Sequence, residues 1–372
     1  MSADSPSEAA AGDFEGYRRS DGRVGVRNDV LVLPSVICSH LVAEEIAERA
    51  GAVATPHDHG CAQLGADNDQ TERTLVSLGE NPNVAGTVVV GLGCEEVQSD
   101  AVAAALDERG FPVREVAIQD AGGTDACIDA GVAAVDDLRA ETDAASVGGA
   151  SLGDLTVGVV VDDLAESTVE RANPLVAGLA DRVLDAGGRV LVAGNERYAA
   201  HPMETRARVK RSAESAVDAF LERHRDLPAR ATRVSADARE AGFDAATGFA
   251  GDHPLADVVA YGERAEADGL SLVDAPSRFE EAATGLAAAG ANLVVHVTAD
   301  GVPAGHPIVP VLKVSGDADT LAALPDDIDV DAREADAADL VDAVRDVADG
   351  RKTRAEAHGL TEFALTRVGP SM

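Results

Sequence analysis

The chain has 372 residues and a formal net charge of −35, from 66 acidic and 31 basic side chains, only three of them lysines. Such a negative field repels nucleic acids and anionic membranes, so we expect neither as a partner. The charge is typical of proteins that stay dispersed in concentrated salt, and we interpret it as halophilic adaptation. Because 45% of the residues are hydrophobic, a disordered acidic chain is excluded, and the length favours about two domains.

Residues 1–15 are acidic and small, and we expect a disordered lead there rather than a signal peptide. No apolar run approaches the roughly 18 residues that a transmembrane helix needs. The sequence therefore predicts a cytoplasmic protein. Its cysteines are far apart, which favours free thiols or metal ligands over disulfides; they are Cys38, Cys61, Cys94 and Cys127.

Short apolar runs alternate with helical patterns, which predicts an α/β fold of two Rossmann-like or flavodoxin-like domains with parallel sheets. In the first half we expect strands at 29–33, 51–56, 86–93 and 112–119, and helices at 39–51, 67–81, 95–110 and 124–141. The small and Gly/Ser-rich residues 142–154 break the pattern. We place the first domain at 16–145 and the second at 154–372.

The second half repeats the alternation. We expect strands at 155–163, 188–195, 269–276, 292–301 and 308–316, and helices at 203–226, 279–291 and 336–350. Residues 226–266 give no clear pattern.

Polar side chains follow each predicted strand of the first half. Because ligands bind beyond the carboxyl ends of parallel strands, these loops are expected to line one crevice. Its candidate residues are Cys38, His57, His59, Cys61, Cys94, Glu95, Gln98, Gln119 and Thr124. Cysteine and histidine together suit iron or zinc. Glu95, at a helix start, suits an acid or base.

Other interpretations of single residues stay open. Cys127, on a helix, is best explained as a small buried hydrophobe, and Cys94 could be one too. His59 could be a solvated loop residue. The "GLGCEE" turn at 91–96 lacks a third glycine, which argues against dinucleotide binding, and the absence of Gly-x-Ser-x-Gly argues against a serine hydrolase.

Several segments resemble the altronate/galactarate dehydratase family, which includes the large subunit of (R)-sulfolactate sulfo-lyase. The segments are "GYRRSDGRVGVRN" (16–28), the Cys38 segment, His57 to Cys61, "NPNVAGTVVVGLGCEEVQ" (81–98), "IQDAGGT" (118–124), "GHPIVPVLKVSG" (305–316) and "DDIDVDA" (326–332). The resemblance implies β-elimination from a hydroxy-acid, usually the loss of water from a sugar acid.

The resemblance also implies Fe²⁺, with Mn²⁺ as an alternative, and a base that removes the proton next to the substrate carboxylate. By this resemblance we assign Glu95 and His57 as catalytic. The metal ligands would be Cys38, His57, Cys61 and Cys94. The substrate would contact Arg23, Arg27, Gln98, Gln119 and Thr124, with the arginines facing its carboxylate.

Two departures from the family pattern qualify this assignment. Single-chain members carry an additional N-terminal SAF-type domain, so we expect a separately encoded small SAF-type subunit and an oligomer. The family's Cys-Gly-Gly-Ser-Asp motif is also replaced, with Val161 in place of the cysteine and 162–165 in place of the rest. Three hypotheses follow: an iron-dependent dehydratase subunit, a diverged lyase with a sulfolactate-like or smaller substrate, or a non-catalytic paralogue.

Overall fold

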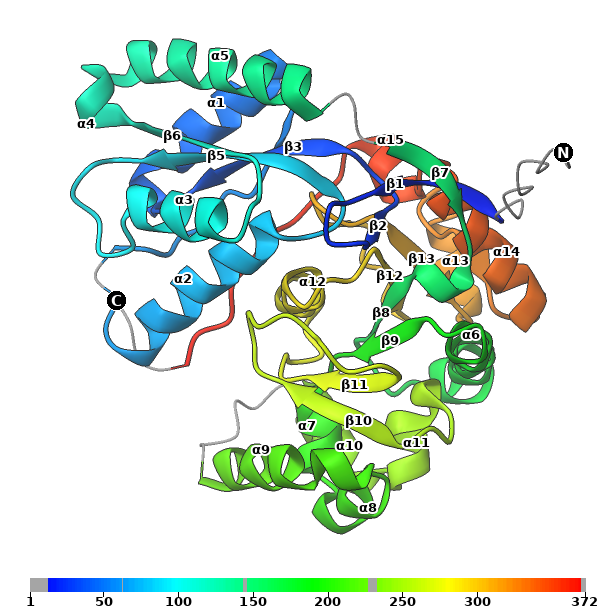
Figure 1. Cartoon of the computed structure of the whole chain (residues 1–372). Helices are drawn as coiled ribbons and strands as arrows, with labels where there is room; N and C mark the ends of the chain where they lie inside the picture. Colours follow the sequence, from blue (N-terminus) through cyan, green and yellow to red (C-terminus); the bar gives the residue numbers. More distant parts are fainter. Residues whose placement is uncertain (1–12, 62, 143–145, 227–232, 369–372) are drawn as a thin grey trace, which may run out of the picture.

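The computed structural model describes residues 13–61, 63–142, 146–226 and 233–368. Within them, two parallel sheets carry helices on both faces, which confirms the predicted α/β fold (Figure 1). We call them the first sheet and the second sheet. Helix α12 (Phe279–Ala288) and the segment that follows α15 (Arg354–His358) run between the two units.

The first sheet has the strand order β4-β3-β5-β6. Its strands are β3 (Asp29–Pro34), β4 (Val53–Ala54), β5 (Val84–Gly91) and β6 (Val113–Ala117). Its helices are α1 (His40–Ala50), α2 (Ala66–Gly79), α3 (Ser99–Glu108), α4 (Ile118–Ala121) and α5 (Thr124–Thr142). Strand β5 is buried throughout, as its unbroken apolar run predicts for a strand covered on both faces. The chain order reverses between β3 and β5, so a ligand is expected beyond their carboxyl ends.

The second sheet has the order β10-β11-β9-β8-β12-β13-β14, and all its paired strands are parallel. Its strands are β8 (Thr156–Val161), β9 (Arg189–Val192), β10 (Leu255–Val259), β11 (Leu270–Val273), β12 (Leu293–Val297), β13 (Val311–Ser315) and β14 (Val330–Asp331). Here the chain order reverses between β8 and β12.

Helices cover both faces of the second sheet. Helix α12 packs on one face, and α6 and α14 pack on the other. The helices of this half other than α12 and α15 are α6 (Asn173–Asp185), α7 (Asn195–Ala199), α8 (Pro202–Ala207), α9 (Glu214–Asp226), α10 (Arg233–Glu240), α11 (Phe243–Thr247), α13 (Ala318–Ala323) and α14 (Ala337–Ala348).

The structure corrects one sequence-based expectation and assigns elements in a stretch for which the sequence gave no prediction. The helix expected at 203–226 is interrupted between α8 and α9, because Val209 pairs with Leu255 and the Lys210 amide donates to the Leu255 carbonyl at 2.8 Å. The unclear stretch 226–266 contains α10, α11 and β10.

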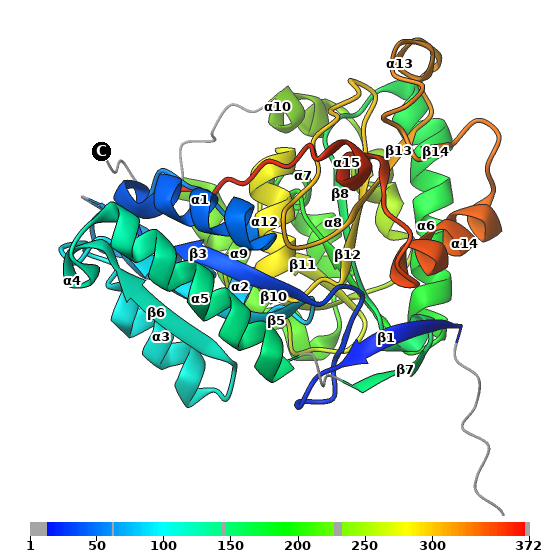
Figure 2. The same cartoon turned by 90° about the horizontal axis from the view of Figure 1, so that it is seen from above.

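The expected linker also contains structure. Its residues Ser146–Ala150 form β7, which pairs antiparallel with β1 (Phe14–Arg18), and β2 (Val24–Gly25) pairs with the other side of β1. This small sheet lies beside α14 (Figure 2). Phe14, at the end of the expected disordered lead 1–15, is buried in the core, whereas residues 1–12 lie outside the described residues.

Two asparagines of the "NPN" segment join the units. The Asn81 amide donates to the carbonyls of Ala287 and Ala291 at 2.8 and 3.0 Å. The Asn83 amide donates to those of Asn292 and Ile308 at 2.7 and 3.1 Å. Apolar side chains of α2 and α12 also share one core cluster, so the two units are packed together. Among the described residues, no helix has the length and apolar character needed to cross a bilayer.

Candidate active site

The loops that follow the strands of the first sheet meet at one edge, which we call the rim: the described residues 35–39, 55–61, 63–65, 92–98 and 118–124. The Ile37 amide donates to the His59 carbonyl at 2.8 Å, and the Gln119 amide donates to the Leu92 carbonyl at 3.1 Å. Gly60 adopts a φ of 87°, and a Cβ there would overlap the Ser35 carbonyl. The loops are therefore in direct contact, as the parallel topology predicts.

Glu95 organises the rim at the switch point between β3 and β5. Its Oε1 accepts hydrogen bonds from Ser35 Oγ at 3.0 Å and from the Leu92 amide at 3.1 Å. Its Oε2 accepts from the Gly93 and Cys94 amides at 2.6 and 2.7 Å. Gly91 must be small because a Cβ there would overlap Ser99 and Glu95. The carboxylate thus holds the loop before α3 against β3, and α3 begins at Ser99 rather than at Glu95 as the sequence predicted.

This arrangement determines the charge of Glu95. Burial acts to raise its pKa, but hydrogen bonds from the backbone of residues 93–95 and from Ser35 outweigh burial, and the pKa is lowered. An ionised carboxylate with four donors is a weak proton acceptor. In this conformation Glu95 is therefore suited to holding the rim, and its predicted catalytic role stays a prediction.

His57 is buried, and both of its ring nitrogens are occupied. Its Nδ1 accepts from the His59 amide at 3.1 Å, so its Nε2 carries the proton and donates to the Pro34 carbonyl at 2.7 Å. Burial lowers the pKa of His57 to about 4, which keeps the ring neutral at neutral pH. A metal would need one of these nitrogens to leave its partner.

His59 is buried rather than solvated, with 3% of its surface exposed. It lies beside two charged side chains: its Nδ1 is 2.9 Å from Asp58, and its Nε2 is 3.3 Å from Arg367 Nε. Burial lowers the pKa of His59, and Arg367 lowers it further although Asp58 opposes this. The sequence alone left this residue undecided.

The cysteines of the rim, Cys38, Cys61 and Cys94, are free and exposed, whereas Cys127 is buried as its helical position predicted. Among the described side chains, no three His, Cys, Asp or Glu residues are close enough to hold a metal ion. The proposed iron ligands therefore do not fit a preformed site in this conformation, since the thiols do not converge with His57. The expected Fe²⁺ or Mn²⁺ stays a prediction.

The uncharged residues of the predicted substrate site lie at the rim. Gln98, Gln119 and Thr124 are all exposed. Gln98 donates to the Glu95 carbonyl, and the Gln119 side chain packs beside Gly93. These groups border the loop that Glu95 holds and could donate to the oxygens of a hydroxy-acid.

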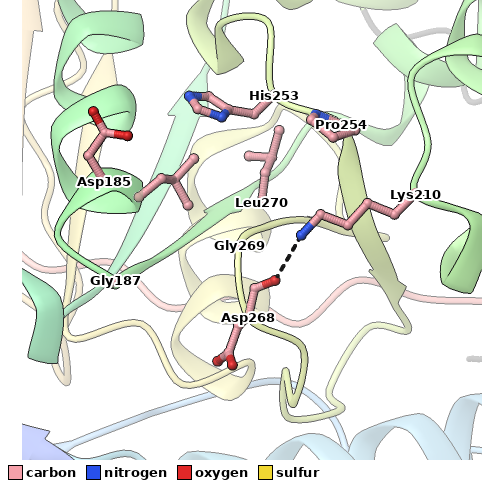
Figure 3. A pocket seen from close by; sticks show the side chains of 10 residues that line it. Asp185, Gly187, Lys210, His253, Pro254, Asp268, Gly269 and Leu270 are labelled. Atoms are coloured by element: carbon pink, nitrogen blue, oxygen red, sulfur yellow. Dashed lines mark hydrogen bonds between the residues drawn. The ribbon is translucent and has the colours of Figure 1, made fainter.

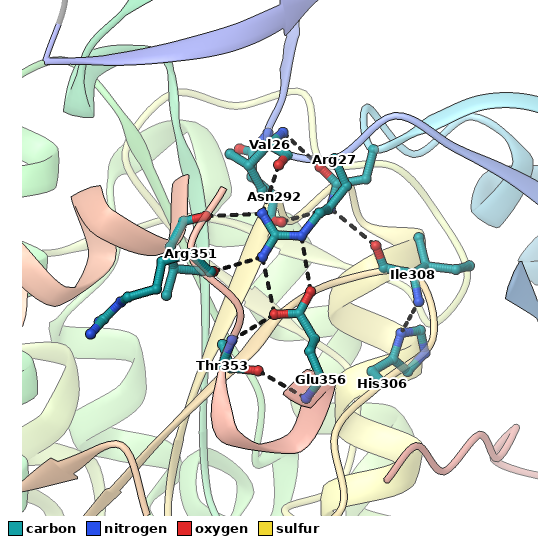
Figure 4. A network of polar contacts seen from close by, with 10 residues as sticks. Val26, Arg27, Asn292, His306, Ile308, Arg351, Thr353 and Glu356 are labelled. Atoms are coloured by element: carbon teal, nitrogen blue, oxygen red, sulfur yellow. Dashed lines mark hydrogen bonds and ion pairs between the residues drawn. The ribbon is translucent and has the colours of Figure 1, made fainter. Parts of the chain in front are cut away.

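Arg23 and Arg27 lie at the other edge of the first sheet, before the amino ends of its strands. Arg27 binds both carboxylate oxygens of Glu356 at 2.9 and 3.0 Å and donates to the carbonyls of Val26, Val347 and Arg351 (Figure 4). Arg23 pairs with Asp21 and donates to the Glu80 carbonyl at 2.7 Å. The structure does not bring these arginines to the rim, because they are used to connect segments distant in sequence.

The C-terminal segment completes one side of the rim, which the sequence did not signal. Arg367 pairs with Asp58 at 3.0 Å, and the Thr366 carbonyl accepts from Gln70 at 2.7 Å. The Phe363 ring lies 6.3 Å from the ring of His57 and 5.6 Å from that of His306. The segment therefore links the rim to the loop between β12 and β13.

Two cavities of the second half lie outside the rim. One, of about 320 Å³, is at the amino ends of β9 and β11, where Gly188 and Gly269 precede the strands and Lys210 donates to the Asp268 carbonyl (Figure 3). The other, of about 470 Å³, lies between α6 and α11. Since the first is at the edge opposite the strand carboxyl ends, we do not assign it to the active site.

Residues 16–143 match the family model described as D-galactarate dehydratase/altronate hydrolase, second domain, and residues 165–371 match D-galactarate/altronate dehydratase, C-terminal. This chain belongs to the D-galactarate/altronate dehydratase family. It is therefore a member of a family of hydro-lyases, as the sequence predicted, and the rim lies in the family's second domain.

Relatives of this family member support the same conclusion. Altronate dehydratase from Bacillus subtilis is 27% identical over 96% of this chain and 78% of its own length. Altronate dehydratase from Escherichia coli is 27% identical over 99% of this chain and 80% of its own length. The (2R)-sulfolactate sulfo-lyase subunit beta from Chromohalobacter salexigens is 29% identical over 95% of this chain and 97% of its own length.

Proposed function

We propose that this chain is the large subunit of a hydro-lyase that removes water from a sugar acid or a related hydroxy-acid such as altronate or galactarate. The observation that carries the proposal is the rim: the loops of the family's second domain are assembled at the switch point, with Glu95 fixed to Ser35 at 3.0 Å. The elimination breaks the C–H bond next to the carboxylate and the C–O bond of the neighbouring hydroxyl. The resulting enol becomes a 2-keto-3-deoxy acid.

In this proposal the chain positions the substrate rather than supplying a preformed metal centre. Gln98, Gln119 and Thr124 donate hydrogen bonds to substrate oxygens, and Glu95 keeps the backbone of Cys94 in place. The resemblance implies that Fe²⁺ polarises the carboxylate or the leaving hydroxyl. Among the described residues, His57 and the rim thiols do not converge, so the chain alone supplies no preformed iron site in this conformation.

We propose a small SAF-type subunit as the partner. The C. salexigens relative supports this, because it is named as the subunit beta of its enzyme, which implies a second subunit there. Arg23 and Arg27, before the amino ends of the first sheet, already make their contacts within the chain. In this proposal a cationic side chain of the partner therefore binds the substrate carboxylate. An oligomer with this composition would then be the active form.

The test is turnover by the chain purified without oxygen in molar potassium chloride, with and without its small partner and added Fe²⁺. Formation of a 2-keto acid from altronate or galactarate, with Gln119→Ala slower by about tenfold, is the expected result. Asp185→Asn, an exposed position at the end of α6 and outside the rim, serves as the control. No turnover of any hydroxy-acid by the reconstituted pair would favour the non-catalytic paralogue.

A second candidate is a sulfo-lyase subunit, which would release sulfite from sulfolactate. The observation that favours it is the likeness to the sulfo-lyase subunit beta, which this chain covers over 97% of its length. The same preparation distinguishes the two activities, because sulfite release and keto-acid release without sulfite are separate readouts.

A further inference from the structure

Exposed apolar side chains gather at the rim. Among the described residues, seven large hydrophobic side chains are exposed, and four of these are Ile37, Leu41, Leu64 and Val368. Ile37 and Leu64 belong to the rim, Leu41 follows Ile37 by four residues at the start of α1, and Val368 ends the described C-terminal segment. We call these four side chains the apolar patch. In a chain with a net charge of −35, such a cluster indicates a surface that contacts another molecule.

Hydrogen bonds join the segments that carry the apolar patch. The Ile37 amide donates to the carbonyl of His59, which lies in the same loop as Leu64, at 2.8 Å. The Val368 amide donates to the carboxylate of Asp67, and the Asp67 amide donates to the Leu64 carbonyl at 3.3 Å. The patch is therefore one surface around the loop after β4. Helix α4, which belongs to the rim, lies at an outer end of the molecule in both views (Figures 1 and 2).

The rim itself carries acidic side chains and no strongly basic ones. Its segments contain no lysine or arginine, whereas Asp58, Glu96 and Asp120 are exposed. Arg367 of the C-terminal segment reaches the rim, but it pairs with Asp58 at 3.0 Å. An anionic hydroxy-acid would be repelled by this surface unless a cation approached from outside the rim. The site that the proposed function needs is therefore incomplete in this chain.

These two features specify the chemistry of a partner. Apolar side chains opposite the patch would be buried against it, and basic side chains opposite Asp58, Glu96 and Asp120 would pair with them. A second copy that presents its own rim fits poorly, because a symmetric contact places each surface against itself and two acidic faces would meet. A separate chain with an apolar and basic contact face meets both requirements.

We propose that the apolar patch is the docking surface for a separate protein chain whose contact face is apolar and flanked by basic side chains. The docked chain covers the rim and supplies the cation that holds the substrate carboxylate. This docking surface rests on the proposed function, since it specifies where the small subunit binds and what that subunit contributes. Cys38, next to Ile37, and Cys61, in the loop that carries Leu64, are covered in the same complex.

The first test measures the binding of the purified small subunit to the wild type, Leu41→Asp and Leu64→Asp by calorimetry in molar potassium chloride. The two leucine side chains are 67% and 80% exposed, so both variants should fold. Each is expected to weaken binding by at least about tenfold, because a carboxylate would be buried against an apolar face. Met203→Asp is the matched control: this side chain, on α8 of the second half, is 76% exposed, and the variant should keep the wild-type affinity.

A second measurement needs no variant. Binding of the small subunit should slow the reaction of the exposed Cys38 and Cys61 thiols with a maleimide by about tenfold, followed by mass spectrometry. The buried Cys127 is the internal reference, and its slow labelling should not change.

Charge reversal tests the basic flank of the partner. Asp120→Lys should lower the association rate severalfold at reduced salt, and the effect should shrink as potassium chloride is raised, because salt screens the attraction that steers association. Asp185→Lys, at the exposed end of α6, is the control and should associate like the wild type. An association rate that Asp120→Lys leaves unchanged or raises would contradict a basic contact face.

Wild-type affinity in Leu41→Asp and Leu64→Asp, or unchanged labelling of both rim thiols, would overturn the docking surface. Self-association of the chain that Leu64→Asp abolishes would assign the patch to a second copy and reject a separate partner. Turnover separates these failures from failure of the proposed function. A chain that converts a hydroxy-acid without binding the small subunit keeps the lyase function and rejects the docking surface, whereas a complex that forms as expected but converts no hydroxy-acid rejects the lyase function alone.

Discussion

Ser35 Oγ donates to Glu95 Oε1 at 3.0 Å, and this bond joins the residue after β3 to the loop after β5. The two strands are neighbours at the switch point of the first sheet, 60 residues apart in sequence. The hydrogen bond between Ser35 and Glu95 fixes the shape of the rim without a ligand. Its effect can therefore be tested by measuring the stability of the protein and the reactivity of the exposed rim thiols.

Replacing Glu95 with Gln is expected to destabilise the protein by about 1–3 kcal/mol, because an amide nitrogen would face backbone donors that the carboxylate now accepts. The freed loop should also let Cys94 react faster with a thiol reagent. Denaturant unfolding and thiol labelling measure the two effects. Glu96→Gln, at the exposed neighbouring position, is the control, and equal behaviour of the two variants would contradict the assigned role of Glu95.

Arg27→Ala is expected to cost about 1–3 kcal/mol of unfolding free energy, because Glu356 and three carbonyls lose the hydrogen bonds that Arg27 donates to them. Ligand affinity should not change, since Arg27 lies away from the rim. Arg49→Ala removes a half-exposed pair with Glu45 and should cost less than about 0.5 kcal/mol. A loss of substrate binding with intact stability would restore the substrate-carboxylate role that the sequence suggested.

Mild acid should destabilise the protein through its buried histidines. Burial lowers the pKa of His57 to about 4 and that of His306 to about 3, below the ordinary value of about 6.5 that applies to the unfolded chain. Between these values the unfolded state binds more protons, so stability is fully present above about pH 6.5 and falls as the pH falls toward the folded-state values.

For His57 alone, this linkage amounts to about 2 kcal/mol between pH 7.5 and pH 5. Denaturant unfolding at the two pH values measures it, and His57→Asn should reduce the difference by that amount. His358→Asn, on the exposed surface, should leave the difference as it is in the wild type. If His57→Asn shows the wild-type pH dependence, the neutral, doubly hydrogen-bonded ring is not the state in solution.

Metal analysis tests the predicted iron. Since no three suitable ligands converge among the described residues, we expect the chain alone to retain well under one equivalent of Fe²⁺ when prepared without oxygen. Near-stoichiometric iron is expected only with the small subunit, and Cys94→Ala should lose it. Stoichiometric iron in the isolated chain would mean that the rim rearranges to form the metal site by itself.

The local sequence determined most of the secondary structure and the place of the rim. Apolar runs of strand length alternate with amphipathic stretches, and parallel pairing then brings the loops after the strands to one edge. Cys38, His57, Cys94 and Gln119 could thus be assigned to one region before any coordinates. This inference needs only chain direction and periodicity, both of which are local properties.

Tertiary structure alone decided how these residues are used. The pairing of His57 Nε2 with Pro34, the position of Arg27 against Glu356, and the pairing of β1 with β7 join residues 23, 329 and more than 100 positions apart. The contacts of the buried His296 with Lys313, at 3.3 Å, and with Asp162, at 2.9 Å, likewise depend on the register of β8, β12 and β13. Hydrogen-bond partners depend on such distant pairings and on burial, because local pattern fixes which residues are polar but not which polar groups meet.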